Sequence, residues 1–405
     1  MSEQLNEVLA FKKTFTRQEP IPSSGIESAT ELMLTGKLHR YNTEADEIAE
    51  TSILEKEFAD YIGTTYCAAF NSCGSAIYVA LKSVGVQPGD KVLCNAFTLA
   101  PVPGAIKNAD AQPVFIEITE DYLTDLDDLE KKAKDSGASY FLLSHMRGHI
   151  VDMDRVMEIC QRYDLTLIED CAHTMGAKWD GKHTGSFGVV GCFSTQTYKH
   201  INSGEGGLLV TDDADVAAKS ILYSGSYMLY EKHLARPPLE VFDRYIKVIP
   251  NFSLRMSNLV ATLIRSQLPE LDKQAQRWNK RYQAIEEILR SQPNIYIPVR
   301  ERKEQYVASS FQFTLRGATT NQMEKFIETC AERGVEIKWF GNFEPKGFTS
   351  RHESWQYLSM AGDLPKTANV LDFLCDFRLP LTFTVEDCRL IAKIICQVCN
   401  ESKFN

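Results

Sequence analysis

The sequence of 405 residues contains no long hydrophobic run. No stretch approaches the about 18 uninterrupted apolar residues that a transmembrane helix needs. The first 22 residues, MSEQLNEVLAFKKTFTRQEPIP, are mixed and charged and contain no apolar core of a secretory signal. These absences argue against a membrane protein, and we expect the chain in the cytoplasm.

Runs of basic residues are also missing. Lysine and arginine together number 44 against 54 aspartates and glutamates, which gives a net charge of −10. Proteins that bind nucleic acids or anionic membranes need clustered positive charge. We therefore expect neither partner, and the acidity mainly favours solubility.

The motifs of several enzyme classes are absent as well. The chain has no H-E-x-x-H, no P-loop, no G-x-S-x-G and no G-x-G-x-x-G. His145 and His149 lie four residues apart, but a glycine turn separates them, so no helix would present both to a metal. The 11 cysteines have no zinc spacing, and Cys396 and Cys399 fall in a helical pattern. We expect buried thiols in a reducing compartment and no metal site.

Short apolar segments alternate with helical patterns over the first two-thirds of the chain. The predicted buried strands cover residues 91–99, 112–118, 140–146, 165–171, 188–194 and 206–211, and helices are predicted at 75–85, 126–137 and 153–164. Nearly all-apolar strands that alternate with helices predict a mainly parallel sheet with helices on both faces, an α/β fold. Ligands of such sheets bind at the carboxyl ends of the strands.

The pattern changes after residue 254. Helix-forming residues dominate 255–289 and predict one long linking helix with a bend near Pro269. Short strands around a helix then indicate a smaller C-terminal α+β domain at 290–405. The N-terminal segment and the large α/β domain would occupy residues 1–254.

Two turns at predicted strand ends contain polar residues that suit a ligand site. Gly74 and Ser75 would open a helix after a strand, where backbone N–H groups can bind phosphate, although a plain tight turn with an N-cap fits too. Asp170 ends an apolar strand and needs a cationic partner or a capping role. His173 could contact the same ligand or be an ordinary satisfied histidine.

Lys199 lies on a short link between two predicted strands, in the segment CFSTQTYKHINSGEGG. Taken alone, it would be a solvated charge. A desolvated lysine, however, has a lowered pKa and can form a Schiff base. The short link places its amine at the same end of the sheet as Asp170.

Six segments in order resemble one known family. They are VGVQPGDKVLCNAFT, QPVFIEI, HMRGHIVDMD, LIEDCAHTMGAKWDGKHTGSFG, FSTQTYKHINSGEGGLLVTDD and NFSLRMSNLVATLIRSQLPEL. The sequence resembles the fold-type I, pyridoxal-phosphate-dependent sugar aminotransferases of the DegT–StrS group, from about residue 55 to 381. The resemblance implies that fold, with a seven-stranded type of sheet, and pyridoxal 5'-phosphate (PLP) as the cofactor.

The resemblance implies roles for three residues at the reacting end of the cofactor. Lys199 would form the Schiff base and move the proton during catalysis. Asp170 would keep the pyridine nitrogen protonated, so that the ring accepts electrons. His173 would lie near the ring oxygen. Some relatives carry histidine at the lysine position and dehydrate sugars; counting five residues back from Gly204 gives Lys199 rather than His200.

The resemblance also implies a phosphate site. Gly74, Ser75 and Ser194 would bind the phosphate within one subunit. The family completes this site with an asparagine of the neighbouring subunit; Ser253 stands at that position here, and Asn251 lies two residues earlier. A shared site implies a homodimer.

Leu99 is a second departure from the family, which usually has an aromatic residue stacked on the ring at this position. Leucine can cover the ring but loses the stacking, worth about 0.5–1.5 kcal/mol. Phe97 would share a face with Leu99 if the strand continued regularly.

The expected reaction is transfer of an amino group from an amino acid, glutamate or glutamine, to a keto-sugar, which would be nucleotide-linked, in amino-sugar biosynthesis. The alternatives are a PLP-dependent sugar dehydratase and a PLP-binding regulator without turnover. Aromatic and charged segments at 36–42, 224–238 and 338–348 could line the acceptor pocket or simply pack as loops.

Overall fold

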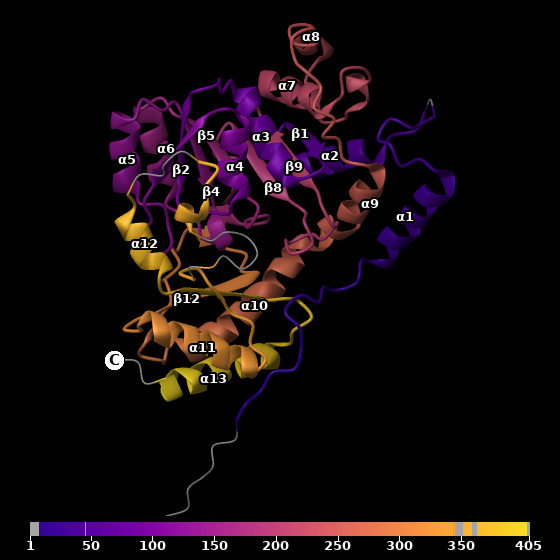
Figure 1. Cartoon of the computed structure of the whole chain (residues 1–405). Coiled ribbons are helices and arrows are strands. Elements are labelled where there is room, and N and C mark those ends of the chain that lie inside the picture. Colours follow the sequence, from indigo (N-terminus) through magenta and orange to yellow (C-terminus); the bar gives the residue numbers. More distant parts are fainter. Residues whose placement is uncertain (1–7, 45, 343, 345–350, 359–362, 403–405) are drawn as a thin grey trace, which may run out of the picture.

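A seven-stranded sheet forms the centre of the N-terminal two-thirds of the chain (Figure 1). The computed structural model describes residues 8–44, 46–342, 344, 351–358 and 363–402. The strands in spatial order are β1 Tyr66–Phe70, β9 Gly207–Thr211, β8 Val190–Ser194, β5 Thr166–Asp170, β4 Tyr140–Ser144, β2 Lys91–Asn95 and β3 Gln112–Ile116. β9 runs antiparallel to both of its neighbours, and the pairs from β8 to β3 are parallel. The mainly parallel sheet predicted from the sequence is confirmed.

Helices cover both faces of this sheet because alternate residues of each strand point to opposite sides. In β4, Leu142 packs into the apolar cluster of one face, whereas Phe141 and Leu143 pack into that of the other. The first face is covered by α3 Cys73–Val84, α4 Pro101–Asn108 and α7 Ala214–Ser224. The second is covered by α5 Leu126–Asp135, α6 Met153–Arg162, α2 Glu50–Ile62 and α9 Asn258–Gln267.

Several of these helices start at a side chain that caps their first turn. Ser72 caps α3, and aspartates cap α5, α6 and α7 by accepting hydrogen bonds from backbone N–H groups. Such caps satisfy donors that have no partner within the helix. The caps therefore fix where each helix begins after its strand.

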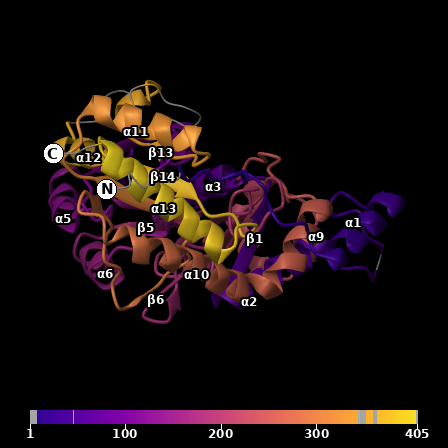
Figure 2. The same ribbon diagram turned by 90° about the horizontal axis from the view of Figure 1, so that it is seen from below.

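The predicted long helix after residue 254 is divided at the proline. α9 ends at Gln267, a 3-10 turn spans Leu268–Glu270, and α10 covers Leu271–Leu289. Pro269 has no N–H group for a helical hydrogen bond and its ring crowds the preceding turn, which explains the break. Figure 2 shows α1 Ser23–Thr35 and α9 extending to one side of the molecule.

A smaller antiparallel sheet lies below the large one in Figure 1. Its strands in spatial order are β10 Ile295–Tyr296, β12 Ser310–Leu315, β14 Leu374–Arg378 and β13 Lys338–Trp339. α11 Thr320–Glu332 and α13 Val385–Ser402 pack with α10 around it. The free cysteines Cys396 and Cys399 lie within α13, as the helical pattern predicts.

One apolar cluster joins residues of α5 and α6 to residues of α10 and α13. The domain boundaries predicted at residues 254 and 289 therefore stay predictions.

α12 Pro365–Leu371 lies far along the chain but reaches the large sheet, where Thr367 donates through its N–H and hydroxyl groups to Glu117 Oε2 at 2.7 and 2.6 Å.

The remaining elements are short. They are β6 Lys178–Trp179, β7 Lys182–His183, β11 Glu304–Gln305, α8 Leu239–Phe242 and the 3-10 turns Met146–Gly148, Tyr230–Lys232 and His352–Ser354. Across the described ranges, no helix combines the length and apolarity needed to cross a membrane.

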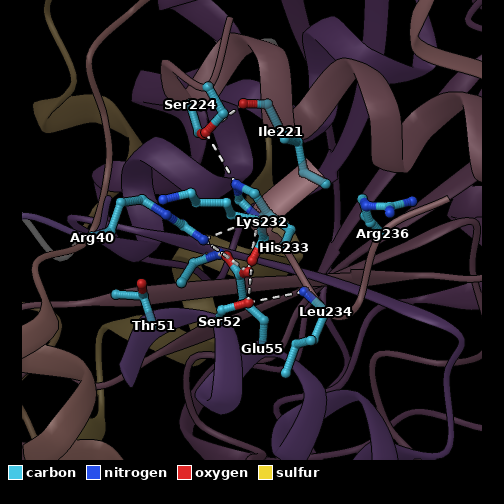
Figure 3. A network of polar contacts seen from close by, with 12 residues as sticks. Arg40, Thr51, Ser52, Glu55, Ile221, Ser224, Lys232, His233, Leu234 and Arg236 are labelled. Carbon is cyan, nitrogen blue, oxygen red and sulfur yellow. Dashed lines mark hydrogen bonds and ion pairs between the residues drawn. The ribbon is translucent and has the colours of Figure 1, made fainter. Parts of the chain in front are cut away.

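A buried ion pair fixes two loops to α2 (Figure 3). Both guanidinium ends of Arg40 donate to Glu55 at 2.9 Å, and His233 Nδ1 lies 2.8 Å from the same carboxylate. Burial alone would raise the pKa of Glu55, but Arg40 and His233 lower it to about 2. Ser52 adds a second link, because it donates to Lys232 O and accepts from Leu234 N. The loop containing residue 40 and the loop around residue 233 are therefore held as one unit.

Candidate active site

A cavity of about 600 Å³ opens where β4, β5 and β8 end. Among the residues predicted from the sequence, those that line it are Gly74, Leu99, Asp170, His173, Ser194 and Lys199. Three predicted residues, Ser75, Asn251 and Ser253, are not part of its lining. The cavity thus brings together residues that are far apart in the sequence, from Gly74 on α3 to Lys199 after β8.

Lys199 lies on the link between β8 and β9. Its N–H donates to Gln196 O at 2.8 Å, in a turn that Thr195 and Gly206 close with a backbone hydrogen bond of 3.0 Å. Burial and the positive charge of Arg147 together lower the pKa of Lys199 to about 8, against the opposing effect of Asp170. An amine with this pKa is partly neutral near pH 8 and can act as a nucleophile or base.

His173 is the immediate partner of that amine. Its Nε2 atom lies 2.8 Å from Nζ of Lys199. Burial holds the pKa of His173 well below its usual range, and the charges of Lys199 and Arg147 act in the same direction. The imidazole is therefore neutral at physiological pH and can accept a hydrogen bond from the ammonium group.

Asp170 is held by two donors at the end of β5. The hydroxyl of Ser144 donates to Oδ2 at 2.7 Å, and Ala172 N donates to Oδ1 at 3.1 Å. Ser144 is in turn fixed by Asn95, which accepts from its N–H at 2.8 Å and donates to its carbonyl at 3.1 Å. This chain of contacts orients the carboxylate into the cavity.

The neighbouring Glu169 has a structural role. Its carboxylate accepts hydrogen bonds from the backbone N–H groups of Gly185, Phe187 and Gly188 at 2.8–2.9 Å. His145 Nε2 lies 3.1 Å from the same group. Glu169 therefore anchors the loop before β8, and of these two adjacent carboxylates only Asp170 lines the cavity.

The start of α3 forms one end of the cavity. Ser72 Oγ accepts from Ser75 N at 3.1 Å and donates to Ser75 Oγ at 3.0 Å, so the cap holds Ser75 in place. The space beside Gly74 is open, because a Cβ atom on this residue would lie 3.9 Å from its nearest neighbour, Ser72 Oγ. Ser194 Oγ accepts from Gln196 N at 3.4 Å and also lines the cavity.

Leu99 lines the cavity, but not as part of a regular strand. β2 ends at Asn95, so the expected strand to residue 99 is wrong, and Phe97 and Leu99 do not share a strand face. The Asn95 side chain donates to Phe97 O at 2.8 Å and turns the chain there. Phe97 is fully buried against Phe340, with ring centroids 5.1 Å apart.

Asn251 and Ser253 are exposed on the segment before α9. Asn251 Oδ1 accepts from Ser253 N at 2.7 Å, and Ser253 has a positive φ of 54°. Their predicted role in a neighbouring subunit's phosphate site stays a prediction.

His200, next to Lys199, points elsewhere. It is buried, with its ring edge-on to Trp278 at 5.2 Å, and it is not part of the cavity lining. Burial lowers the pKa of His200 to about 3, with a smaller effect from Lys199. The residue at the cavity is the lysine.

Three cations line the cavity, and two of them, Arg147 and Arg378, were not predicted from the sequence; the third is Lys338. Lys338 begins the predicted pocket segment 338–348, of which residues 343 and 345–348 lie outside the described residues. The other candidate segments, 36–42 and 224–238, contribute no residue to the lining. Arg147 lies in the 3-10 turn Met146–Gly148 and Arg378 ends β14, but the sequence context of these arginines does not distinguish them from surface charges.

The lining residues suit PLP. A helix N-terminus with an open glycine and Ser194 can hold a phosphate, Asp170 can pair with a protonated ring nitrogen, and Lys199 offers a partly neutral amine. This site on a mainly parallel sheet defines a PLP-dependent enzyme of fold type I. The chain belongs to the DegT/DnrJ/EryC1/StrS aminotransferase family, whose model matches residues 34–394.

The chain is also similar to named relatives, and it shares its fold with solved structures. GDP-perosamine synthase of Caulobacter vibrioides is 33% identical over 220 residues, which cover 54% of this chain and 56% of that enzyme. GDP-perosamine synthase of Escherichia coli O157:H7 is 26% identical over 285 residues, 70% of this chain and 74% of that enzyme. The PLP form of Spr1654 from Streptococcus pneumoniae has the same fold, with a TM-score of 0.80, 18% identity and coverage of 97% of this chain and 100% of that one.

Proposed function

We propose that this protein transfers an amino group from glutamate or glutamine to the ketone of a nucleotide-linked keto-sugar, in amino-sugar biosynthesis. The observation that carries this proposal is the contact of Lys199 Nζ with His173 Nε2 at 2.8 Å, in a cavity that Asp170 also lines. The family and the names of the GDP-perosamine synthases support both the reaction and a sugar acceptor.

The residues of the cavity would have different roles in this reaction. Bound PLP would supply an electron-accepting ring that stabilises negative charge on the substrate carbon. Asp170, held by Ser144, would keep a proton on the ring nitrogen. Lys199 would hold the cofactor covalently at rest and then carry a proton at Nζ, a role typically worth about 10²–10⁴-fold in rate.

His173 would assist by accepting a hydrogen bond from Nζ of Lys199. A neutral imidazole at 2.8 Å orients the amine without adding a second positive charge. Ser194 and the amide groups at Gly74 would hold the phosphate. Leu99 would cover the ring by dispersion contacts alone.

Transamination is favoured over sugar dehydration by the position of the lysine. Lys199 lines the cavity, while His200 packs against Trp278. A residue able to hold the cofactor covalently is what transamination requires. A regulator without turnover would not need a lysine of lowered pKa beside a buried aspartate.

A homodimer with shared active sites is part of the proposal. Asn251 and Ser253 are exposed and outside the cavity of their own subunit, so a neighbouring subunit is where they could complete a phosphate site. Large apolar side chains are also exposed on α1 and on the loop held by the Arg40–Glu55 pair; they include Met33, Leu34, Tyr227 and Met228. Their burial against a second copy would stabilise the dimer. The free thiols are consistent with a cytoplasmic location.

The test uses the purified protein loaded with PLP. Glutamate and glutamine are added separately, and loss of the absorbance of the lysine-bound cofactor is followed together with release of the keto acid. Products from a panel of nucleotide-linked and free keto-sugars are then identified by mass spectrometry. We expect an amino-sugar from the wild type and none from Lys199→Ala. A deoxygenated product formed without consumption of an amino donor would replace this proposal with dehydration.

A further inference from the structure

Three cationic side chains from separate parts of the chain meet at the wall of the cavity. Arg147 comes from the 3-10 turn after β4, Lys338 from β13 and Arg378 from the end of β14. All three also line a second, adjoining cavity of about 440 Å³. They therefore stand between two open spaces, where the small sheet meets the large one.

These cations are only partly neutralised by the protein. Arg147 forms an ion pair of 2.6 Å with Asp376, whose other oxygen accepts from Gln312. Within the described ranges, neither Lys338 nor Arg378 has a carboxylate at ion-pair distance. Lys338 Nζ instead lies 4.6 Å from the ring centre of Phe340.

The guanidinium of Arg378 is held in place by an aromatic ring. It lies 3.8 Å from the ring centre of Tyr198, the residue before Lys199. Burial and the charge of Arg147 lower the pKa of Lys338 to about 8, and Asp376, its cross-strand neighbour, opposes this shift without reversing it. Positive charges gathered in a partly buried cavity repel one another, and an anion that enters between them relieves this repulsion.

The cluster is distinct from the place that suits the cofactor phosphate. That end of the cavity, at Ser72, Gly74 and Ser194, offers amides and hydroxyls. The cations act instead near the reacting amine, since Arg147 and Arg378 both lower the pKa of Lys199. An anion at the cluster would therefore belong to the molecule that reacts there.

We infer that Arg147, Lys338 and Arg378 form an anion-binding subsite for a carboxylate or phosphate group of the substrate. The inference rests on the proposed transamination and deepens it. The donor and the acceptor use the same cavity in turn, so an anionic group on either one can occupy the subsite. The carboxylates of the amino acid donor and the phosphates of a nucleotide-linked acceptor are the two sources of this chemistry.

The experiment measures binding of non-reacting probes to the PLP-loaded enzyme by calorimetry. Glutarate is a dicarboxylate that lacks an amine, and pyrophosphate represents the phosphorylated acceptor; the occupied cofactor site keeps pyrophosphate out of the phosphate end. Arg378→Met and Lys338→Met each remove one cation, and Arg147 is kept because it pairs with Asp376. The exposed residues Arg302 and Lys247 give the matched controls Arg302→Met and Lys247→Met.

We expect each cavity variant to weaken binding of at least one probe by about tenfold or more, because charge-assisted hydrogen bonds are the stronger class. The controls should bind as the wild type does, and the melting temperature of each variant shows that it is folded. Loss of glutarate binding would assign the subsite to the donor, and loss of pyrophosphate binding would assign it to the acceptor. Equal binding by the wild type and both cavity variants, or no binding of either probe, would overturn the inference. These results do not depend on turnover, so a failure of the proposed reaction is seen separately in the half-reaction with glutamate.

Discussion

Nζ of Lys199 lies 2.8 Å from Nε2 of His173 at the edge of the large sheet. The two groups are held in a site where a charged lysine is disfavoured. Burial, with the charges of Arg147 and Arg378, accounts for a pKa lowered to about 8. Such a site lowers the stability of the folded protein, since a protonated lysine is less stable there than in water.

The first prediction concerns the stability of the apoprotein. Lys199→Met removes the buried charge, so the variant should be more stable than the wild type by up to roughly 3 kcal/mol at pH 7. In the wild type the folded pKa of Lys199, about 8, is below the ordinary value of 10.5. Between these pH values the unfolded state thus binds more protons than the folded state. The difference in free energy of unfolding between Lys199→Met and the wild type should therefore decrease as the pH rises from about 8 to 10.5.

Denaturant unfolding of both apoproteins at pH 7, 8.5 and 10 measures this difference. The thiols of the unfolded chain titrate alike in variant and wild type, so their contribution to the pH dependence cancels in the comparison. Lys247→Met, at an exposed site, is the control and should show no pH-dependent difference. A Lys199→Met variant that is less stable than the wild type at pH 7 would contradict the prediction.

The second prediction concerns the contacts that hold Asp170. Asp170→Asn cannot keep a proton on the ring nitrogen of the cofactor, and we expect the rate to fall by about 10²-fold or more. Ser144→Ala removes the hydroxyl that donates to Asp170 Oδ2 at 2.7 Å, and its effect should be smaller, about tenfold. The measurement is kcat for the half-reaction with glutamate. If Ser144→Ala impaired the reaction more than Asp170→Asn does, the hydroxyl would act on the substrate and not through Asp170.

The sequence was informative where local patterns suffice and uninformative where distant segments meet. Apolar strands that alternate with helices predicted the sheet, and the polar residues at strand ends predicted Asp170 and Lys199 at one edge. The end of β2 at Asn95 was missed because it depends on a hydrogen bond from that side chain to Phe97 O. Lys338 and Arg378 reach the cavity from the small sheet, and that packing depends on contacts across more than a hundred residues.

The third prediction concerns the buried pair of Arg40 and Glu55. Glu55→Gln leaves the charge of Arg40 buried without its partner, which typically costs about 3–5 kcal/mol. The free energy of unfolding, measured by denaturant titration at pH 7, should fall by that amount. Glu57→Gln breaks the part-exposed contact with Arg265 and should cost about 1 kcal/mol or less.

The stability that the Arg40–Glu55 pair contributes depends on pH. Arg40 and His233 outweigh burial and lower the pKa of Glu55 from 4.5 to about 2. A lowered carboxyl pKa contributes stability that is fully present above about pH 4.5 and is lost as the pH falls toward 2. The difference in free energy of unfolding between the wild type and Glu55→Gln should therefore decrease as the pH falls from 4.5 to 3. A gap that stays constant over this range would show that the carboxylate is not the source of the stability.

The fourth prediction concerns Leu99, where the family usually carries an aromatic residue. Leu99 lines the cavity and packs beside the cluster that contains Phe97 and Phe340. Leu99→Tyr would add stacking on the cofactor ring, worth about 0.5–1.5 kcal/mol, so PLP should bind roughly 2–10-fold more tightly. Fluorescence titration of the apoprotein with PLP measures this affinity, and Leu99→Met, which keeps the volume without a ring, is the control. Equal affinity for Leu99→Tyr and Leu99→Met would mean that residue 99 borders the cavity without lying over the ring, and that another side chain covers it.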